Sequence, residues 1–308
     1  MADVDPAIIA ERLLRLKCTR PFDGLDTQSL SILVSAGREM VCSTTTRLAA
    51  EGERASAHWV ALTGRLQALR RGESLPGESI EDGFGGLSLL TELSLPVDLI
   101  AEAGTVLFVL DADALIETLE EHGALARAVL RAMAGSLLDA RRKGGTAEST
   151  RVTVAVPARG QRQQLDLISR MMAIRSTVGL QARNAAVLTR LARVARVERL
   201  PPGRSLWLDP SAPADLVVVI EGALQGRPDD EDGPASGRGA LYGLMEAVTS
   251  VPPLAPVVTT AESTALVVSQ AEIQEALDDD DRICLGLIRL AALDLWRAFW
   301  RAHPLPEP

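Results

Sequence analysis

The residues best suited to chemistry are few and widely separated in this chain of 308 residues. Its three histidines, His58, His122 and His303, match no catalytic triad and no metal-binding spacing. We expect each of them at the surface or at its boundary. The acidic runs 229–232 and 278–281 lack calcium-loop spacing, and we interpret them as a solvated loop and as the first turn of a helix. The sequence therefore predicts no enzyme, no metal site and no cofactor.

Length and composition point to a globular protein with two domains. The chain is 47% apolar and 24% charged, and its net charge of −9 disfavours nucleic acid as a partner. Cys18, Cys42 and Cys284 lie far apart without metal spacing, which indicates ordinary thiols in a reducing compartment. The charged, amphipathic start is unlike a signal peptide, and no apolar run approaches the ~20 residues of a membrane span. We expect a cytoplasmic protein that does not bind membranes.

The stretch 83–101, with the sequence GFGGLSLLTELSLPVDLIA, has the most distinctive pattern. It predicts a strand ending in Phe-Gly, a short apolar helix over 87–93 and a new strand after a proline. This order resembles the phosphate-binding cassette of cyclic-nucleotide-binding domains, as in catabolite-activator-type regulators and protein kinase A regulatory subunits. The family pattern is roughly F-G-E-[LIM]-[AS]-L-L followed by P-R-[ST]-A. The matching residues are Phe84, Gly85, Leu87, Ser88, Leu89, Leu90 and Pro96.

The two charged contacts that the resemblance implies are missing from this first cassette (residues 83–101). In the family, backbone N–H groups at the helix start bind the cyclic phosphate, a Glu binds the ribose hydroxyl and an Arg neutralises the phosphate. Here Gly86 stands in place of the Glu and Val97 in place of the Arg. Residues 72–126 contain twelve Asp and Glu but no Lys or Arg, so a phosphate would be repelled. We infer a cassette that has lost its ligand.

Short strands with helices at both ends surround this cassette. Such a pattern predicts a mainly β fold with flanking helices, a jelly roll rather than a parallel sheet. Glycines and turn residues separate the strands. We expect helices over 6–20, 26–37, 111–121 and 124–142, and strands over 38–42, 47–50, 58–62, 66–70, 98–101 and 106–110.

A shift of 158 residues relates the first half of the chain to the second. Gly64, Leu66 and Gln67 correspond to Gly222, Leu224 and Gln225, and the same shift relates the last helices. The sequence thus predicts a tandem duplication with domains over 1–143 and 163–303, a linker over 144–162 and a tail over 304–308. The second cassette (residues 242–257) has lost more of the family pattern. Tyr242 and Gly243 persist, Leu244 replaces the Glu, and Ala255 or Val257 replaces the Arg.

Positive charge is concentrated in the middle of the chain. Residues 141–204 hold fourteen Lys and Arg against three Asp and Glu, a net +11, which leaves −20 for the rest of a chain whose total is −9. Arg190, Arg193 and Arg196 are spaced three apart, which predicts one helix face with Arg183 nearby. This region could be a DNA-binding helix-turn-helix, but the matching helix of the first half precedes a jelly roll. We favour a solvated or self-docking basic face.

The predicted helix over 281–302 is apolar nearly all round, unlike an exposed helix that packs along one face. Trp296, Phe299 and Trp300 form an aromatic cluster there. Two interpretations stay open. The helix could be core, or it could form an interface with a second copy or a partner protein, as the family resemblance implies.

The sequence as a whole favours a non-catalytic interaction or assembly protein, built on two cyclic-nucleotide-binding-like domains that no longer bind cyclic nucleotides. We expect a protein partner or self-association. The alternative is a sensor of another small ligand, uncharged or cationic, that regulates a partner. A DNA-binding regulator is the third and least favoured class.

Overall fold

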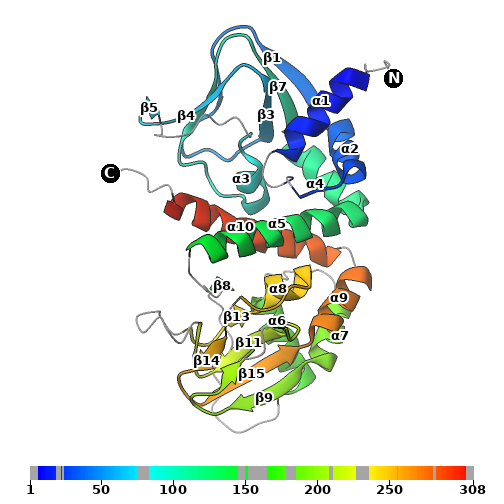
Figure 1. The fold of residues 1–308 in the computed structure, drawn as a ribbon, viewed down its shortest axis with the longest axis vertical. Coiled ribbons are helices and arrows are strands. Elements are labelled where there is room, and N and C mark those ends of the chain that lie inside the picture. Colours follow the sequence, from blue (N-terminus) through cyan, green and yellow to red (C-terminus); the bar gives the residue numbers. More distant parts are fainter. Residues whose placement is uncertain are drawn as a thin grey trace. The chain divides into compact units, whose positions relative to one another are not determined.

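The computed structural model divides the chain into two compact units (Figure 1). Unit 1 consists of residues 1–133 and 295–308, and unit 2 of residues 134–294. This division does not test the predicted domain boundaries at 143 and 163, which stay predictions. The structure describes residues 6–18, 22, 24–74, 83–144, 150–151, 165–177, 185–207, 211–226, 236–254, 256–279 and 282–302.

Unit 1 contains two antiparallel sheets, with strand orders β1-β7-β3 and β2-β6-β4-β5. Its strands are β1 (Arg38–Cys42), β2 (Thr46–Ala49), β3 (Ala57–Thr63), β4 (Leu66–Arg70), β5 (Glu73–Ser74), β6 (Asp98–Ala101) and β7 (Thr105–Asp111). Its helices are α1 (Pro6–Lys17), α2 (Thr27–Ala36), α3 (Gly86–Thr91), α4 (Ala112–Glu121), the first half of α5 (Gly123–Gly144) and the end of the last helix, from residue 295.

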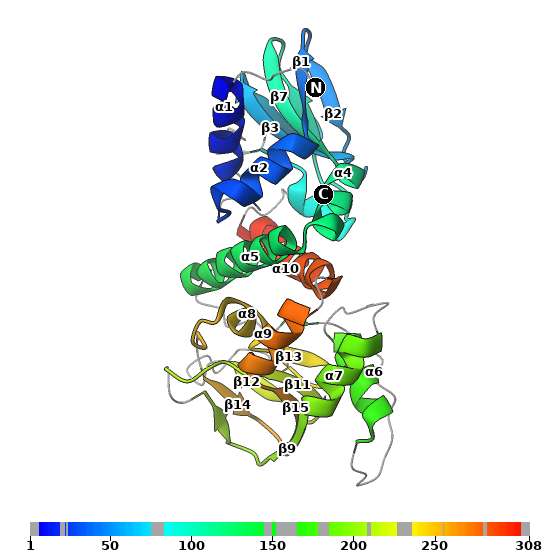
Figure 2. The ribbon, with the colours of Figure 1, turned by 90° about the vertical axis from the view of Figure 1, so that its right-hand side faces the viewer.

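Local sequence explains where the elements of unit 1 begin. Asp26 caps α2, because its carboxylate accepts a hydrogen bond of 2.8 Å from the backbone N–H of Ser29. The first six residues of β3 are all buried, since this strand lies under α1 and beside the central strand β7 (Figure 2). Helices and sheets together enclose a core of apolar side chains, and Phe22, Leu33, Phe108, Leu110 and Leu115 are completely buried.

Unit 2 also contains two antiparallel sheets, with strand orders β8-β13-β11-β15-β9 and β10-β14-β12. Its strands are β8 (Thr150–Arg151), β9 (Arg196–Leu200), β10 (Ser205–Leu206), β11 (Leu216–Glu221), β12 (Leu224–Gly226), β13 (Ala240–Tyr242), β14 (Val257–Thr259) and β15 (Ser263–Val268). Its helices are α6 (Leu167–Thr177), α7 (Ala185–Val194), α8 (Leu244–Thr249) and α9 (Gln270–Asp279). In addition, α5 contributes its residues from 134, and α10 (Arg282–Ala302) contributes its residues up to 294.

The predicted antiparallel sheets with flanking helices are confirmed, and strands 38–42, 66–70 and 98–101 have the predicted bounds. The predicted mainly β fold understates the helical content of the protein. The reason is the length of α5 and α10, which span 22 and 21 residues, whereas no described strand exceeds seven. One helix prediction is also wrong, because Asp278 and Asp279 end α9 rather than begin the next helix.

Candidate functional site

The first cassette begins with a pair of backbone hydrogen bonds to β3. The N–H of Trp59 donates to the carbonyl of Phe84 at 2.9 Å, and the N–H of Phe84 donates to the carbonyl of Trp59 at 2.8 Å. Gly85 follows with a left-handed φ of 101° and caps α3. Glycine is required here, because a Cβ on Gly85 would overlap the carbonyl oxygen of Ala57.

The side chain of His58 contacts the same turn. Its Nδ1 lies 3.0 Å from the carbonyl oxygen of Phe84, so the neutral imidazole carries its proton on Nδ1. The ring packs edge-on against Phe22, with 5.4 Å between centroids. His58 is completely buried, which corrects the prediction of a surface or boundary histidine. Burial lowers the pKa of His58 from 6.5 to about 4, against the opposing effect of the Phe84 hydrogen bond.

The positions of the two missing charged contacts offer no polar side chain. Gly86 is buried as the first residue of α3, and it carries no side chain at all. Val97 has no exposed surface and stands between Leu95 and Leu99, which are 1% and 0% exposed. An anion at Val97 would therefore lie in a place shielded from solvent, where an unpaired charge is costly.

The hydroxyl groups of α3 donate hydrogen bonds to backbone carbonyls of the cassette itself. Ser88 donates to the carbonyl of Leu93 at 2.5 Å, and Thr91 donates to the carbonyl of Leu87 at 2.8 Å. The exposed ion pair between Arg54 and Glu92 is loose, at 3.7 Å. These groups stabilise the fold of the cassette and present no recognisable anion site.

The second cassette repeats this geometry with other side chains. Gly243 has a φ of 77° and caps α8, and a Cβ on it would overlap the carbonyl oxygen of Asp215. Leu244, the first residue of α8, is 3% exposed. Of the two candidates for the Arg position, Val257 is 3% exposed and Ala255 lies outside the described residues.

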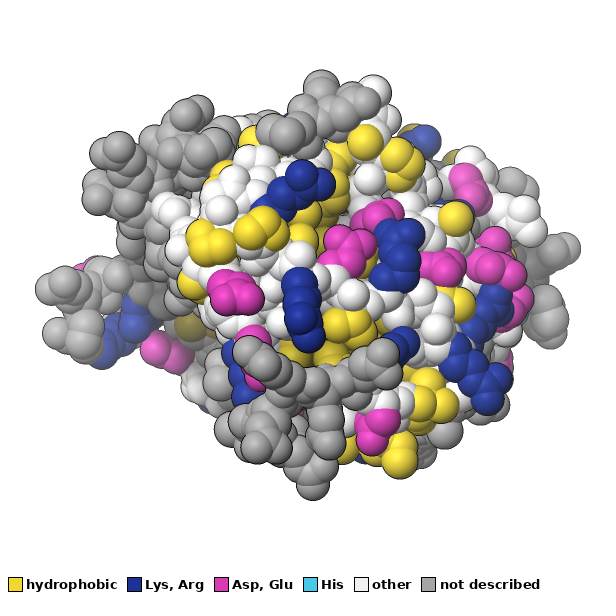
Figure 3. Space-filling view, turned by 90° about the horizontal axis from the view of Figure 1, so that it is seen from below, with side chains coloured by type: hydrophobic (Ala, Val, Ile, Leu, Met, Phe, Trp, Pro, Cys, Tyr) yellow, Lys and Arg dark blue, Asp and Glu magenta, His cyan; other side chains and the backbone are white. Residues whose placement is uncertain are grey.

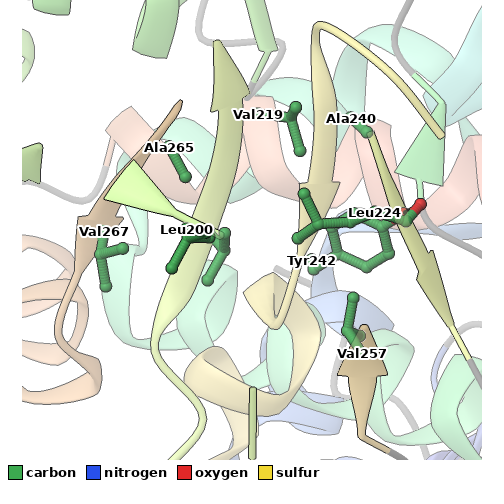
Figure 4. Packing of buried hydrophobic residues seen from close by; sticks show 9 residues of the cluster. Leu200, Val219, Leu224, Ala240, Tyr242, Val257, Ala265 and Val267 are labelled. Carbon is green, nitrogen blue, oxygen red and sulfur yellow. Dashed lines mark hydrogen bonds between the residues drawn. The ribbon is translucent and has the colours of Figure 1, made fainter. Parts of the chain in front are cut away.

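The space between the two sheets of unit 2 is filled by an apolar cluster (Figure 4). Tyr242 lies within it and donates its hydroxyl to the carbonyl of Leu224 at 2.8 Å. Leu206 and Trp207 pack against the cluster from its side. Its buried members are Leu200, Val217, Val219, Leu224, Ala240, Tyr242, Val257, Ala265 and Val267. The side chains of the protein itself thus occupy the interior of this sandwich.

Glu246 is a feature that the sequence analysis missed. It lies on α8 with 8% of its surface exposed, and its buried Oε2 has no hydrogen-bond partner among the described residues. A signal was available, because Glu246 is the only charged residue between Gly239 and Ala261.

The arginines of the predicted basic face are in part neutralised by carboxylates of unit 2. Arg190 on α7 forms ion pairs with Glu275, at 2.5 Å, and with Asp279 on α9. Arg196 pairs with Asp215 at 3.3 Å. Arg193 is exposed.

The expectation that Arg190, Arg193 and Arg196 share one helix face is wrong. α7 ends at Val194, and Arg196 begins β9, which pairs with β15. Arg183 lies outside the described residues. Among the described residues of the face shown in Figure 3, basic and acidic side chains are interspersed and form no continuous positive stripe.

The candidate interface lies at the end of α10, in unit 1. The rings of Trp296 and Trp300 meet edge-on, with centroids 5.5 Å apart and planes inclined by 68°, and both residues are partly buried. Phe299 belongs to the helix, but its side chain is outside the described part of the chain. In the preceding turns the apolar residues are core: Ile283, Cys284, Leu287, Ile288, Leu290, Ala291, Ala292 and Leu295 are buried.

A metal site among the described residues would need several ligating side chains close together. Within those residues, no group of three His, Cys, Asp or Glu side chains is placed to hold a metal ion. None of the described helices is both long and apolar enough to cross a membrane.

Comparisons with solved structures found similar chains at low identity. The chain is 16% identical to the cAMP-bound regulatory domain of Toxoplasma gondii PKA, with 90% of this chain and 96% of the other covered and a TM-score of 0.34. It is 15% identical to a mutant regulatory subunit of a cAMP-independent protein kinase A from Trypanosoma brucei bound to cAMP, with 99% and 94% covered and a TM-score of 0.36.

A shorter match is a cyclic nucleotide-binding-like protein from Brucella abortus. It is 18% identical over 35% of this chain and 97% of the other, with a TM-score of 0.31. No protein-family model and no curated protein sequence matches the chain.

Proposed function

We propose that the chain is a non-catalytic interaction or assembly protein. In this proposal two cyclic-nucleotide-binding-like domains arose by duplication and have lost their nucleotide. The cassette sequence, the paired antiparallel sheets of each unit and the filled ligand positions support it.

The duplication is supported by elements that correspond at one constant offset of 158 residues. α2 (27–36) corresponds to α7 (185–194), β1 (38–42) to β9 (196–200), α3 (86–91) to α8 (244–249) and α4 (112–121) to α9 (270–279). Strand register follows the same offset. Arg38 pairs with Val109 in unit 1, as Arg196 pairs with Val267 in unit 2. Equal bounds and equal register in two stretches of one chain are what a tandem duplication leaves behind.

The loss of the nucleotide rests on one observation: Val97 occupies the phosphate-neutralising position as a completely buried core residue. A charged group at this place would have to displace hydrocarbon that now packs the sandwich. Gly86 supplies no acceptor for a ribose hydroxyl, and the neighbouring stretch 72–126 is acidic without a single Lys or Arg. Both the charge and the packing oppose an anionic ligand.

Calorimetric titration with cyclic AMP and cyclic GMP tests the loss. We expect no saturable heat up to millimolar nucleotide. The combined change Gly86→Glu and Val97→Arg should not restore binding, because the new guanidinium would lie in the apolar core rather than in a pocket. A micromolar affinity of the unaltered protein for either nucleotide would overturn this part of the proposal.

An interface at the end of α10 is the second part of the proposal. Trp296 and Trp300 retain some exposed surface, and a large aromatic side chain covers ~150–250 Å². At ~25 cal/mol per Å², covering the exposed part of each indole, at most about a third of its surface, contributes at most about 1–2 kcal/mol. Two adjacent rings of this kind can anchor a partner helix or a second copy, whereas the surrounding charges would mainly orient it.

Light scattering on the unaltered protein and on Trp296→Ala with Trp300→Ala tests the interface. We expect an associated form that the double change disperses while the melting temperature shows a folded protein. Leu14→Ala, which shortens a side chain of a residue 66% exposed on α1, is the matched control and should leave the mass unchanged. A folded double variant with unaltered mass and unaltered partners would remove α10 as the interface.

A further inference from the structure

An indole ring stands against the left-handed glycine of the cassette in both units. In unit 1, Cε3 of Trp59 lies 3.1 Å from the place a Cβ of Gly85 would take. In unit 2, Cζ2 of Trp207 lies 3.0 Å from the corresponding place at Gly243. The same kind of ring thus closes the same turn in each half of the molecule.

The two rings come from positions that do not correspond. Trp59 belongs to β3, and the residue 158 positions later is Val217. Trp207 follows β10, and the residue 158 positions earlier is Ala49. At the two corresponding positions, unit 1 has Ala49 and Trp59, whereas unit 2 has Trp207 and Val217. Each unit therefore has one indole and one small aliphatic residue, in exchanged positions. Such an exchange keeps the volume at the turn filled, as close-packed interiors require.

The two indoles differ in how firmly they are held. Trp59 is 3% exposed in a regular strand. Trp207 is partly buried, and its backbone has a φ of 58°, in the left-handed region that bulky residues avoid. Its contacts with Gly243 and with the apolar cluster of unit 2 hold it in this conformation. Backbone strain of this kind persists only where surrounding contacts enforce it.

We propose that Trp207 is an intramolecular occupant of the second cassette, where its indole takes the place of a bound ligand. This inference rests on the proposed loss of the nucleotide. When the Trp207 side chain is removed, the place against Gly243 should accept a planar, uncharged aromatic molecule of the size of indole. In unit 1 the buried ring of Trp59 fills the corresponding place against Gly85.

Free indole is the probe, and Trp207→Gly is the variant, because glycine keeps the left-handed backbone without strain. We expect the variant to melt about 5 °C or more below the unaltered protein, since a cavity replaces the ring. Indole at ten times its dissociation constant should raise the melting temperature of the variant by about 3 °C. It should leave the unaltered protein and the control Trp296→Ala unchanged.

Equal responses to indole in Trp207→Gly and in the two controls would overturn the proposal. If Trp207→Gly does not fold, the hydrogen exchange of the α8 amides is measured in the Trp207→Phe variant instead. Faster exchange in α8 than in α3 supports the proposed role of Trp207, and unchanged exchange overturns it. Cyclic AMP is titrated in parallel. Its binding to the unaltered protein would contradict the proposed function, whereas an absent indole response would contradict only the role of Trp207.

Discussion

Lowering the pH should destabilise the protein through His58. Burial lowers the pKa of this imidazole to about 4, from 6.5 in the unfolded chain. Between these two values the unfolded chain carries the proton and the folded protein does not. The unfolded state therefore binds more protons, and the free energy of unfolding falls as the pH falls. The contribution is fully present above pH 6.5 and is lost by about pH 4.

The size of the effect follows from the difference between the pKa values. Each pKa unit corresponds to about 1.4 kcal/mol, so the total contribution of His58 is about 3 kcal/mol. About 2 kcal/mol of it should be lost between pH 7 and pH 5, where few unperturbed carboxylates are protonated. The structural cause is specific. Nδ1 is engaged with the Phe84 carbonyl, and Nε2 has no hydrogen-bond partner among the described residues to stabilise a second proton.

Urea unfolding at pH 7, 6 and 5 measures this loss. His58→Asn is the test variant, since its amide can still donate to Phe84 but does not titrate. We expect the unaltered protein to lose about 2 kcal/mol more than this variant between pH 7 and pH 5. His122→Asn, at an exposed histidine, should behave like the unaltered protein. Parallel pH curves for the unaltered protein and His58→Asn would refute the lowered pKa.

Two further changes test the cassettes themselves. Gly85→Ala should cost about 2 kcal/mol or more in urea unfolding, because a left-handed φ and the Ala57 carbonyl both oppose a Cβ. Gly135→Ala, in α5 with nothing within 4 Å of its Cβ, should instead be neutral or stabilising, and equal effects of the two changes would contradict the reasoning. Tyr242→Phe should cost about 1 kcal/mol in the same assay, because the Leu224 carbonyl loses one buried donor and keeps the Ser236 N–H, and no loss would show that this bond is dispensable.

The short strands and their turns could be predicted because their signals are local. Gly64, for example, has a φ of 86° between β3 and β4, a conformation that glycine adopts at little cost. The predicted bounds of β1, β4 and β6 agree with the structure for the same reason. The cassette turn could likewise be located from its Phe-Gly pair, since the left-handed residue must be a glycine.

Features decided by packing could not be predicted. A histidine at a strand start has no local property that tells burial from exposure, and the Phe22 ring and the Phe84 carbonyl at His58 come from distant segments. The three-residue spacing of arginines suits a helix, but pairing with β15 makes Arg196 part of a strand. Trp207 offered no signal either, because its partner Gly243 lies far along the chain.

The division of the chain into units has a consequence for synthesis on the ribosome. Unit 1 contains both the first 133 residues and the last 14, whereas unit 2 is one continuous segment between them. A growing chain can therefore complete unit 2 before unit 1, although most of unit 1 emerges first. Loss of the residues after 294 would remove part of unit 1 and leave the segment that forms unit 2 intact.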